Sequence, residues 1–338
     1  MTTPRSVLSL LFTAPLALLA FFIALHAGGF GGDLPPWRLL LATSLGAAIL
    51  AAPFFLGLRR GALAAFLLLC LPLGVLMAQR PSNDRNWAEA ASRTAHATID
   101  GNLVTIHDIR NFRYHDDGTW TADWYDAVFD LEEIRESYFL LTTFGGIEGI
   151  GHVMVSFRFG DDQFIVLSVE IRREEGEEYD PIAGVFRNYE LIYVAADERD
   201  ALALRTHIHQ DPTWMIPMNA GPEKTGEFFL DMVQRMTALH HQPEWYNTIT
   251  SSCSSNLARH YEVINDLRLP PDFRILMPGF SGELLAELDL LPEGVTAQDA
   301  VELFRIDELA RDLPLDEHFS LRLRPDLPGL VTSSPPGD

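Results

Sequence analysis

Three long apolar runs open the chain, at residues 6–27, 39–58 and 61–78. Each contains about 18–22 residues, close to the roughly 20 that an α-helix needs to cross the hydrocarbon core of a bilayer. Only Arg59 and Arg60 separate the second run from the third, a spacing typical of a tight turn between two helices. The pattern predicts three transmembrane helices within residues 1–80, so we expect a protein integral to the membrane.

Basic residues predict the orientation of these helices. Arg5 and the Arg59–Arg60 pair are expected to face the cytoplasm, and the loop at 28–36 is expected to face the opposite side. Three crossings of the cytoplasmic (inner) membrane then place the rest of the chain on its periplasmic or outer side. The alternative, a cleaved signal peptide at the first run, leaves the same residues outside.

Shorter segments of alternating polarity follow a polar linker at 81–100. The most regular of them, at 152–159, places apolar side chains on one face and polar side chains, His152 among them, on the other. A turn at 160–162 and a second alternating segment at 164–172 complete a β-hairpin. The remaining periodicity predicts strands at 107–114, 120–129, 138–143 and 189–195, and helices at 201–208, 223–239 and 254–265. We therefore expect an α+β domain over 101–328, followed by a disordered tail at 329–338.

The charge of the outer part excludes one class of partner. The chain has 25 basic and 47 acidic residues, a net charge of −22. The first 80 residues hold five of the bases and one of the acids, which leaves a net charge of −26 on residues 81–338. Because nucleic-acid binding needs a basic footprint, no nucleic-acid partner is expected. The same charge argues against broad electrostatic docking onto anionic lipid.

Two side chains of the outer part have surroundings that suit catalysis. Cys253 is the only cysteine after residue 80, since Cys70 lies in an apolar run, and it sits among small polar residues at the start of a predicted helix. A helix N-terminus and a neighbouring imidazolium both stabilise a thiolate, and the amides of the first turn can bind an oxyanion. We predict Cys253 as the nucleophile and His152 as the general base and then acid.

A third polar group is expected to orient the histidine from the neighbouring strand. Ser168 and Glu170 share one face of the 164–172 segment and are the candidates, with Glu170 preferred. A lone cysteine is more often a small core residue than a nucleophile, but the polar surroundings of Cys253 are unsuited to a core position.

Other histidines raise the question of a metal site. The His207/His209 and His240/His241 pairs match no recognised ligand spacing, and the acidic run 174–178 lacks the spacing of a calcium loop. No glycine motif for binding phosphate is present. Neither a metal nor a cofactor is therefore expected.

Four separated motifs then occur in order along the outer part. They are His107-Asp108-Ile109-Arg110-Asn111-Phe112-Arg113-Tyr114, Gly151-His152-Val153-Met154-Val155-Ser156-Phe157, Ser168-Val169-Glu170-Ile171-Arg172, and Tyr246-Asn247-Thr248 with Cys253. Together they resemble the Lnb family, membrane proteins that carry the Lnb N-terminal periplasmic domain. The resemblance runs from about residue 100 to about 325 and includes the segments 276–280 and 319–322.

This resemblance implies a circularly permuted papain-like fold, with an antiparallel sheet and a nucleophile helix, in which the histidine precedes the cysteine. It also implies a lipoprotein intramolecular transacylase, which moves an acyl chain from the glyceryl group of a lipidated N-terminal cysteine to its α-amino group. Cys253 would hold the acyl chain as a thioester and His152 would move the proton. The expected substrate-binding or positioning residues near the cleft are Arg110, Asn111, Arg113, Tyr246 and Asn247.

One residue departs from the family pattern. Ser252 precedes the cysteine, where asparagine is frequent in the family. The difference puts the oxyanion support and the choice of substrate in question, and it leaves the nucleophile in place.

The leading hypothesis is a membrane-anchored, extracytoplasmic thiol acyltransferase acting on a membrane lipid or a lipid-anchored protein. It requires an apolar slot for the acyl chain. One alternative is a papain-like cysteine peptidase or amidase of the envelope, which needs an open polar groove. A second alternative is a non-catalytic envelope binding module, for which Cys253→Ala leaves function intact.

Overall fold

The computed structural model describes residues 4–26, 35–115, 117–147 and 149–324, with side chains from residue 11 onward. The predicted tail at 329–338 and most of the loop at 28–36 lie outside these residues. The chain divides into two compact units, described separately here. One comprises Met1–Ala88, Ile171–Leu191 and Pro243–Thr248, and the other comprises Glu89–Glu170, Ile192–Gln242 and Ile249–Asp338.

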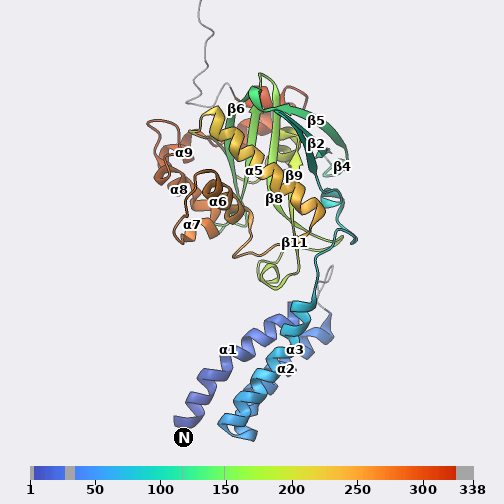
Figure 1. Ribbon diagram of the computed structural model, residues 1–338, viewed down its shortest axis with the longest axis vertical. Helices are drawn as coiled ribbons and strands as arrows, with labels where there is room; N and C mark the ends of the chain where they lie inside the picture. The colour runs from blue at the N-terminus through green and yellow to red at the C-terminus, as the bar shows by residue number, and fades with distance from the viewer. Residues whose placement is uncertain (1–3, 27–34, 116, 148, 325–338) are drawn as a thin grey trace, which may run out of the picture. The chain divides into compact units, whose positions relative to one another are not determined.

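The first unit contains the helices α1 (Pro4–His26), α2 (Pro36–Leu56) and α3 (Leu58–Ala78) (Figure 1). Within the described residues, α2 and α3 are long and apolar enough to cross a membrane. The part of α1 with described side chains, Leu11–His26, is apolar but shorter than a span. The structure thus supports two of the three predicted spans, and the first stays a prediction.

The turn between α2 and α3 lies earlier than the sequence pattern predicts. Gly57, with φ of 75°, separates the two helices, and Arg59 and Arg60 already belong to α3. Glycine occupies this left-handed conformation without the cost that a Cβ would impose. Gly61 then lets the helices approach closely, because a Cβ there would lie 2.3 Å from Cα of Pro53.

A mostly antiparallel sheet forms the centre of the remaining structure (Figure 1). Its strand order is β1-β2-β9-β8-β7-β6-β10, with β5 paired to β2 and β11 paired to β9. A single parallel bridge joins Arg110 of β2 to Ala196 of β9 among the described pairings. The strands are β1 (His96–Asp100), β2 (Leu103–Arg110), β5 (Trp124–Asp130), β6 (Ile134–Thr143), β7 (Gly151–Phe159), β8 (Gln163–Arg172), β9 (Glu190–Ala196), β10 (Thr213–Pro217) and β11 (Glu244–Trp245), with a separate pair β3 (Arg113–Tyr114) and β4 (Trp120–Thr121).

The predicted hairpin is confirmed as β7 and β8, with Met154 opposite Ser168. Its apolar face packs against α5 (Pro222–His241), the long helix that crosses one face of the sheet in Figure 1. The rings of Phe157 and Phe159 lie 5.1 and 5.0 Å from that of Phe229, centroid to centroid. Burial of these aromatic side chains fixes the hairpin, and with it the polar face that carries His152.

The helix predicted after Cys253 is also confirmed, as α6 (Cys253–Ile264). The other helices are α4 (Glu198–Ala203), a π-helical turn η4 (Leu204–Ile208), α7 (Phe273–Leu276), α8 (Ser281–Glu287), α9 (Ala297–Leu303), α10 (Asp307–Asp312) and α11 (Phe319–Leu323), with 3-10 turns η1 (Glu89–Ala91), η2 (Leu131–Glu133), η3 (Ala183–Phe186) and η5 (Pro278–Phe280). The fold is mixed α+β as predicted. Its relation to a permuted papain-like fold stays a prediction.

Candidate active site

Cys253 is the first residue of α6, and a capping box fixes the start of that helix. The Ser252 amide donates to Oγ of Ser255 at 2.7 Å, while the Ser255 amide donates to Oγ of Ser252 at 3.4 Å. This exchange satisfies amides that would otherwise lack partners and holds the thiol at the positive end of the helix dipole. Ser252, where the family often has asparagine, thus serves as the N-cap.

His152 lies near the start of β7 and contacts both predicted orienting residues on β8. Its Nε2 is 2.8 Å from Oγ of Ser168 and 3.0 Å from Oε1 of Glu170. Oγ of Ser168 also donates to Oε1 of Glu170 at 2.7 Å. Because both contacts use Nε2, we infer that Nδ1 faces the Cys253 thiol, and each of these two groups shifts the pKa of the other. The structure thus brings together the four residues that the sequence suggested.

Arg205 is a fifth member of this group that the sequence analysis missed. It lies in the π-helical turn η4, and one of its guanidinium nitrogens is 3.5 Å from Oε1 of Glu170. Its position depends on a contact between segments 35 residues apart, and no local motif marks it. The guanidinium shares the carboxylate charge with His152 and so helps to keep Glu170 ionised.

Electrostatics at the site favour a thiolate–imidazolium pair. Burial alone would lower the pKa of His152, but the charges of Glu170 and Cys253 and hydrogen bonds to both raise it to about 9. Burial would likewise raise the pKa of Cys253, yet the neighbouring imidazolium lowers it overall. Burial opposes ionisation of Glu170 as well, and His152 and Arg205 outweigh it and lower its pKa. Charge pairing dominates desolvation at all three groups.

The rate of Cys253 alkylation by iodoacetamide is expected to rise with pH around a midpoint below the pKa of an ordinary thiol, about 8.5. The lowered thiol pKa populates the thiolate from below that value, and the imidazolium persists until the pH passes about 9. In His152→Ala the midpoint should rise, because burial then acts on the thiol without the opposing cation. Mass spectrometry in a Cys70→Ser background gives the rates, and an unchanged midpoint in the variant would contradict the pairing.

The predicted substrate-binding residues are held by other contacts. Nε of Arg110 donates to Asp200 at 2.8 Å within a buried ion pair that Tyr114 also joins. Asn111 contacts Asp123 at 3.3 Å and is hydrogen-bonded by Arg199. These contacts suit the positioning role for Arg110 and Asn111, and a substrate contact by either stays a prediction.

The other three members of that set are less closely tied to the site. Arg113 is exposed on β3. Tyr246 and Asn247 belong to the unit that contains the apolar helices. Their roles toward a substrate stay predictions.

The histidines considered for metal binding are engaged differently. Within the described residues, no group of three or more histidine, cysteine, aspartate or glutamate side chains has an arrangement that holds a metal ion. His240 instead stacks on His96 with ring centroids 4.2 Å apart, and His107 also stacks on His96, at 4.9 Å. No local pattern marks this stack, because it joins three separate elements.

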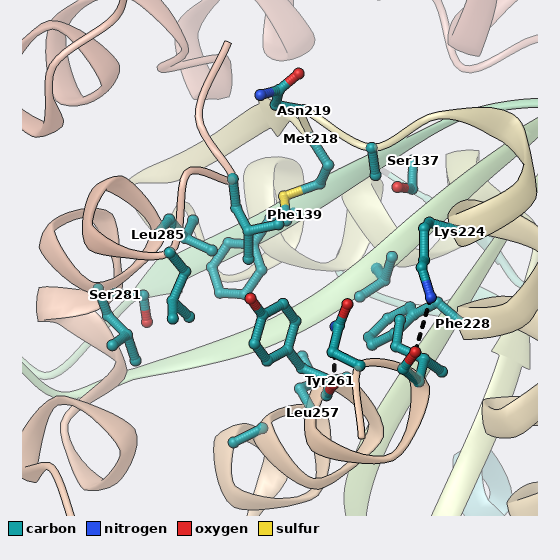
Figure 2. A pocket seen from close by; sticks show the side chains of 18 of the residues that line it. Ser137, Phe139, Met218, Asn219, Lys224, Phe228, Leu257, Tyr261, Ser281 and Leu285 are labelled. Atoms are coloured by element: carbon teal, nitrogen blue, oxygen red, sulfur yellow. Dashed lines mark hydrogen bonds between the residues drawn. The ribbon is translucent and has the colours of Figure 1, made fainter. Parts of the chain in front are cut away.

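An apolar cavity of about 350 Å³ lies in the same unit as the site (Figure 2). Its lining includes Val153 and Ser254, the chain neighbours of His152 and Cys253. Phe139 of β6, Phe228 of α5, Leu257 of α6 and Leu285 of α8 supply much of the wall. Val153 points to the face of β7 opposite His152, and neither His152 nor Cys253 is part of the lining. The cavity therefore begins at Ser254, the residue after Cys253, and it forms where six elements meet.

The fold and the site define a mixed α+β protein with candidate membrane helices and a paired cysteine and histidine. Residues 120–279 match the family model of the Lnb N-terminal periplasmic domain. The match supports the predicted assignment to the Lnb family and indicates an envelope-associated protein. It covers His152, Ser168, Glu170 and Cys253, whereas the 107–114 motif lies before it. No curated protein and no solved structure matches the chain.

Proposed function

We propose that the protein is a multi-pass, membrane-anchored cysteine acyltransferase whose domain, at about 101–328, works on the periplasmic or outer side. A membrane region at 1–80 and a linker at 81–100 precede that domain. The observation that carries the proposal is the hydrogen-bonded series from Cys253 through His152 to Ser168 and Glu170. The substrate would be a membrane lipid or lipid-anchored protein, and the proposed reaction includes no metal or cofactor.

Two displacement steps at Cys253 complete the proposed reaction. The thiolate attacks an ester carbonyl of the lipid, a C–S bond forms, and the ester C–O bond breaks as His152 gives its proton to the leaving glyceryl oxygen. An amine, in the lipoprotein case the α-amino group of the lipidated cysteine, then attacks the thioester and loses a proton to His152. The thiolate leaves, and the acyl chain ends as an amide.

Backbone amides at the start of α6 support the negative charge of the tetrahedral intermediates. The first amides of a helix have no intrahelical acceptor and point along its axis. Of these, the Ser255 amide is used by the Ser252 cap. The oxyanion therefore depends on the amides closest to Cys253.

The apolar cavity beside the pair favours an acyl chain over a peptide. A papain-like peptidase or amidase remains the nearest alternative, because the same nucleophile and base serve peptide hydrolysis. The polar groove it needs has no counterpart in the cavity that Val153 and Ser254 line. A non-catalytic binding module would have no use for a thiol with a lowered pKa.

Intact mass spectrometry of the full chain, after incubation with a diacylglyceryl lipopeptide, tests the proposal. The expected result is one acyl-sized adduct on the wild-type protein, none on Cys253→Ala, and conversion of the lipopeptide to its N-acyl isomer. Cleavage of the peptide would point to the peptidase. An unchanged lipopeptide and no adduct would remove the acyltransferase, and retained cellular function of Cys253→Ala would favour the binding module.

A further inference from the structure

The cavity follows one face of the nucleophile helix from end to end. Its lining includes six residues of this segment, Ser254, Leu257, Ala258, Tyr261, Ile264 and Asn265. Steps of three and four residues place these side chains on one side of the helix. Eleven residues at 1.5 Å each correspond to about 16 Å of helix axis. The cavity thus starts beside Cys253 and continues along α6 for about that length.

The shape fits one long, thin ligand. A volume of about 350 Å³ lies near the lower end of ligand pockets, which range over roughly 300–1,000 Å³. That volume extends along the whole of α6 and is bordered on its other sides by β6, β7, α5, α7 and α8. Figure 2 shows Tyr261 pointing from α6 toward Phe139 of β6, so aromatic side chains border the passage.

The two cations of the lining are already paired. Nζ of Lys224 donates to the Ile264 carbonyl at 2.8 Å and to Glu227 at 2.7 Å. The Arg274 guanidinium is held by Asp272 and Glu287. With these cations engaged, the walls offer mainly aliphatic and aromatic carbon, and a ligand headgroup would find little to bind inside.

We propose that the cavity is a tunnel for one unbranched acyl chain, which lies along α6 with its carbonyl at Cys253 and its methyl end toward Ile264. This inference rests on the proposed function and adds the place and direction of the chain. The tunnel gives the enzyme selectivity for long chains, because each methylene lying along Leu257, Ala258 and Tyr261 is removed from water. Peptide side chains are too short to use its distal half.

Acylation by p-nitrophenyl palmitate and p-nitrophenyl butyrate tests the tunnel in the full chain. The Cys253 thiolate forms a C–S bond to the acyl carbon, the ester C–O bond breaks, and the release of p-nitrophenolate reports the rate. Ala258→Phe fills the passage just past the nucleophile and is expected to lower the palmitate-to-butyrate rate ratio by about tenfold or more. Val263→Phe, on the exposed face of the same helix, is the matched control and should keep the wild-type ratio.

The two esters separate failure of the tunnel from failure of the proposed function. If wild-type protein releases p-nitrophenolate from neither ester, the acyltransferase proposal fails. If butyrate reacts and the ratio in Ala258→Phe equals that of the wild type, only the tunnel is wrong. If Ala258→Phe slows the reactions of both esters by the same factor, the tunnel is likewise wrong.

A covalent probe gives a second measurement that needs no variant. A long-chain acyl chloromethyl ketone alkylates Cys253 with loss of chloride, and a diazirine at its far end then cross-links to the nearest residues. We expect cross-links to the 261–265 segment and to α8. Cross-links confined to residues outside the lining would overturn the tunnel even in a protein that turns over no ester.

Discussion

The His152→Ala variant is expected to transfer acyl groups about a thousandfold more slowly than the wild type, or slower still. Two contributions of His152 are lost together. The imidazolium no longer lowers the pKa of the Cys253 thiol, and burial then favours the unreactive protonated form. No group remains to protonate the leaving oxygen or to accept the proton of the attacking amine. The release of p-nitrophenolate in a single turnover measures the loss, and activity within tenfold of the wild type would contradict the assigned role.

Variants on β8 separate the two candidates for the third residue. The charge of Glu170 is the leading influence that raises the pKa of His152, to about 9, against the effect of burial. Glu170→Gln should therefore lower the pH at which the imidazolium loses its proton, and activity at alkaline pH should fall with it. Ser168→Ala removes a neutral hydrogen bond at 2.8 Å and should leave that pH nearly unchanged. If Ser168→Ala lowers that pH more than Glu170→Gln does, Ser168 is the orienting residue.

Local periodicity predicted the parts of this fold in which one face is buried. The hairpin of β7 and β8 was predictable because its apolar face packs against α5, so the alternation is strict. α6 was predictable because small polar residues precede a segment of helical spacing, and the capping residues Ser252 and Ser255 belong to that polar run. Cys253 and His152 could be identified for the same reason, since each is a reactive side chain in polar surroundings.

Features that depend on distant contacts were not predictable. The strand expected at 107–114 divides into the end of β2, at Arg110, and β3, at Arg113–Tyr114. Within β2 the register shifts at Asp108, which has φ of 60° and whose amide donates to Asp126 at 3.0 Å. No pattern in the residues around Asp108 signals that partner. Arg205 reaches Glu170 from a separate helical turn, and the cavity needs side chains from six elements at once. Sequence reasoning therefore predicted the four side chains that the structure brings together, and it missed the more distant contacts around them.

Arg324→Met is expected to destabilise the folded domain by about 3–5 kcal/mol at neutral pH, because it leaves a buried carboxylate without its partner. Two nitrogens of Arg324 donate to the two carboxylate oxygens of Glu198, each at 2.8 Å, and the Ser156 hydroxyl donates to the same carboxylate at 2.5 Å. The guanidinium also lies 3.8 Å from the ring centroid of Phe164. Methionine retains part of that packing and removes the charge. The loss of stability therefore measures mainly the cost of leaving the Glu198 carboxylate unpaired.

The pH dependence of this loss follows from Glu198. Burial alone would raise its pKa, but Arg324 lowers it in the folded protein, so the ionised pair adds stability above the ordinary carboxyl pKa and loses it as the pH falls through the lowered value. In Arg324→Met the Glu198 carboxyl can take up a proton instead. The difference in unfolding free energy between the variant and the wild type should therefore shrink in acid. Urea unfolding followed by tryptophan fluorescence measures both conditions.

A surface pair and a double variant show whether the cost comes from the unpaired charge. Arg135 and Glu133 form an exposed ion pair at 2.6 Å, and Arg135→Met should change stability by less than about 1 kcal/mol. Adding Glu198→Gln to Arg324→Met removes the stranded charge and should recover part of the loss. If the double variant is no more stable than Arg324→Met alone, the packing of Arg324 against Phe164 of β8, rather than the ion pair, accounts for the stability that Arg324 contributes.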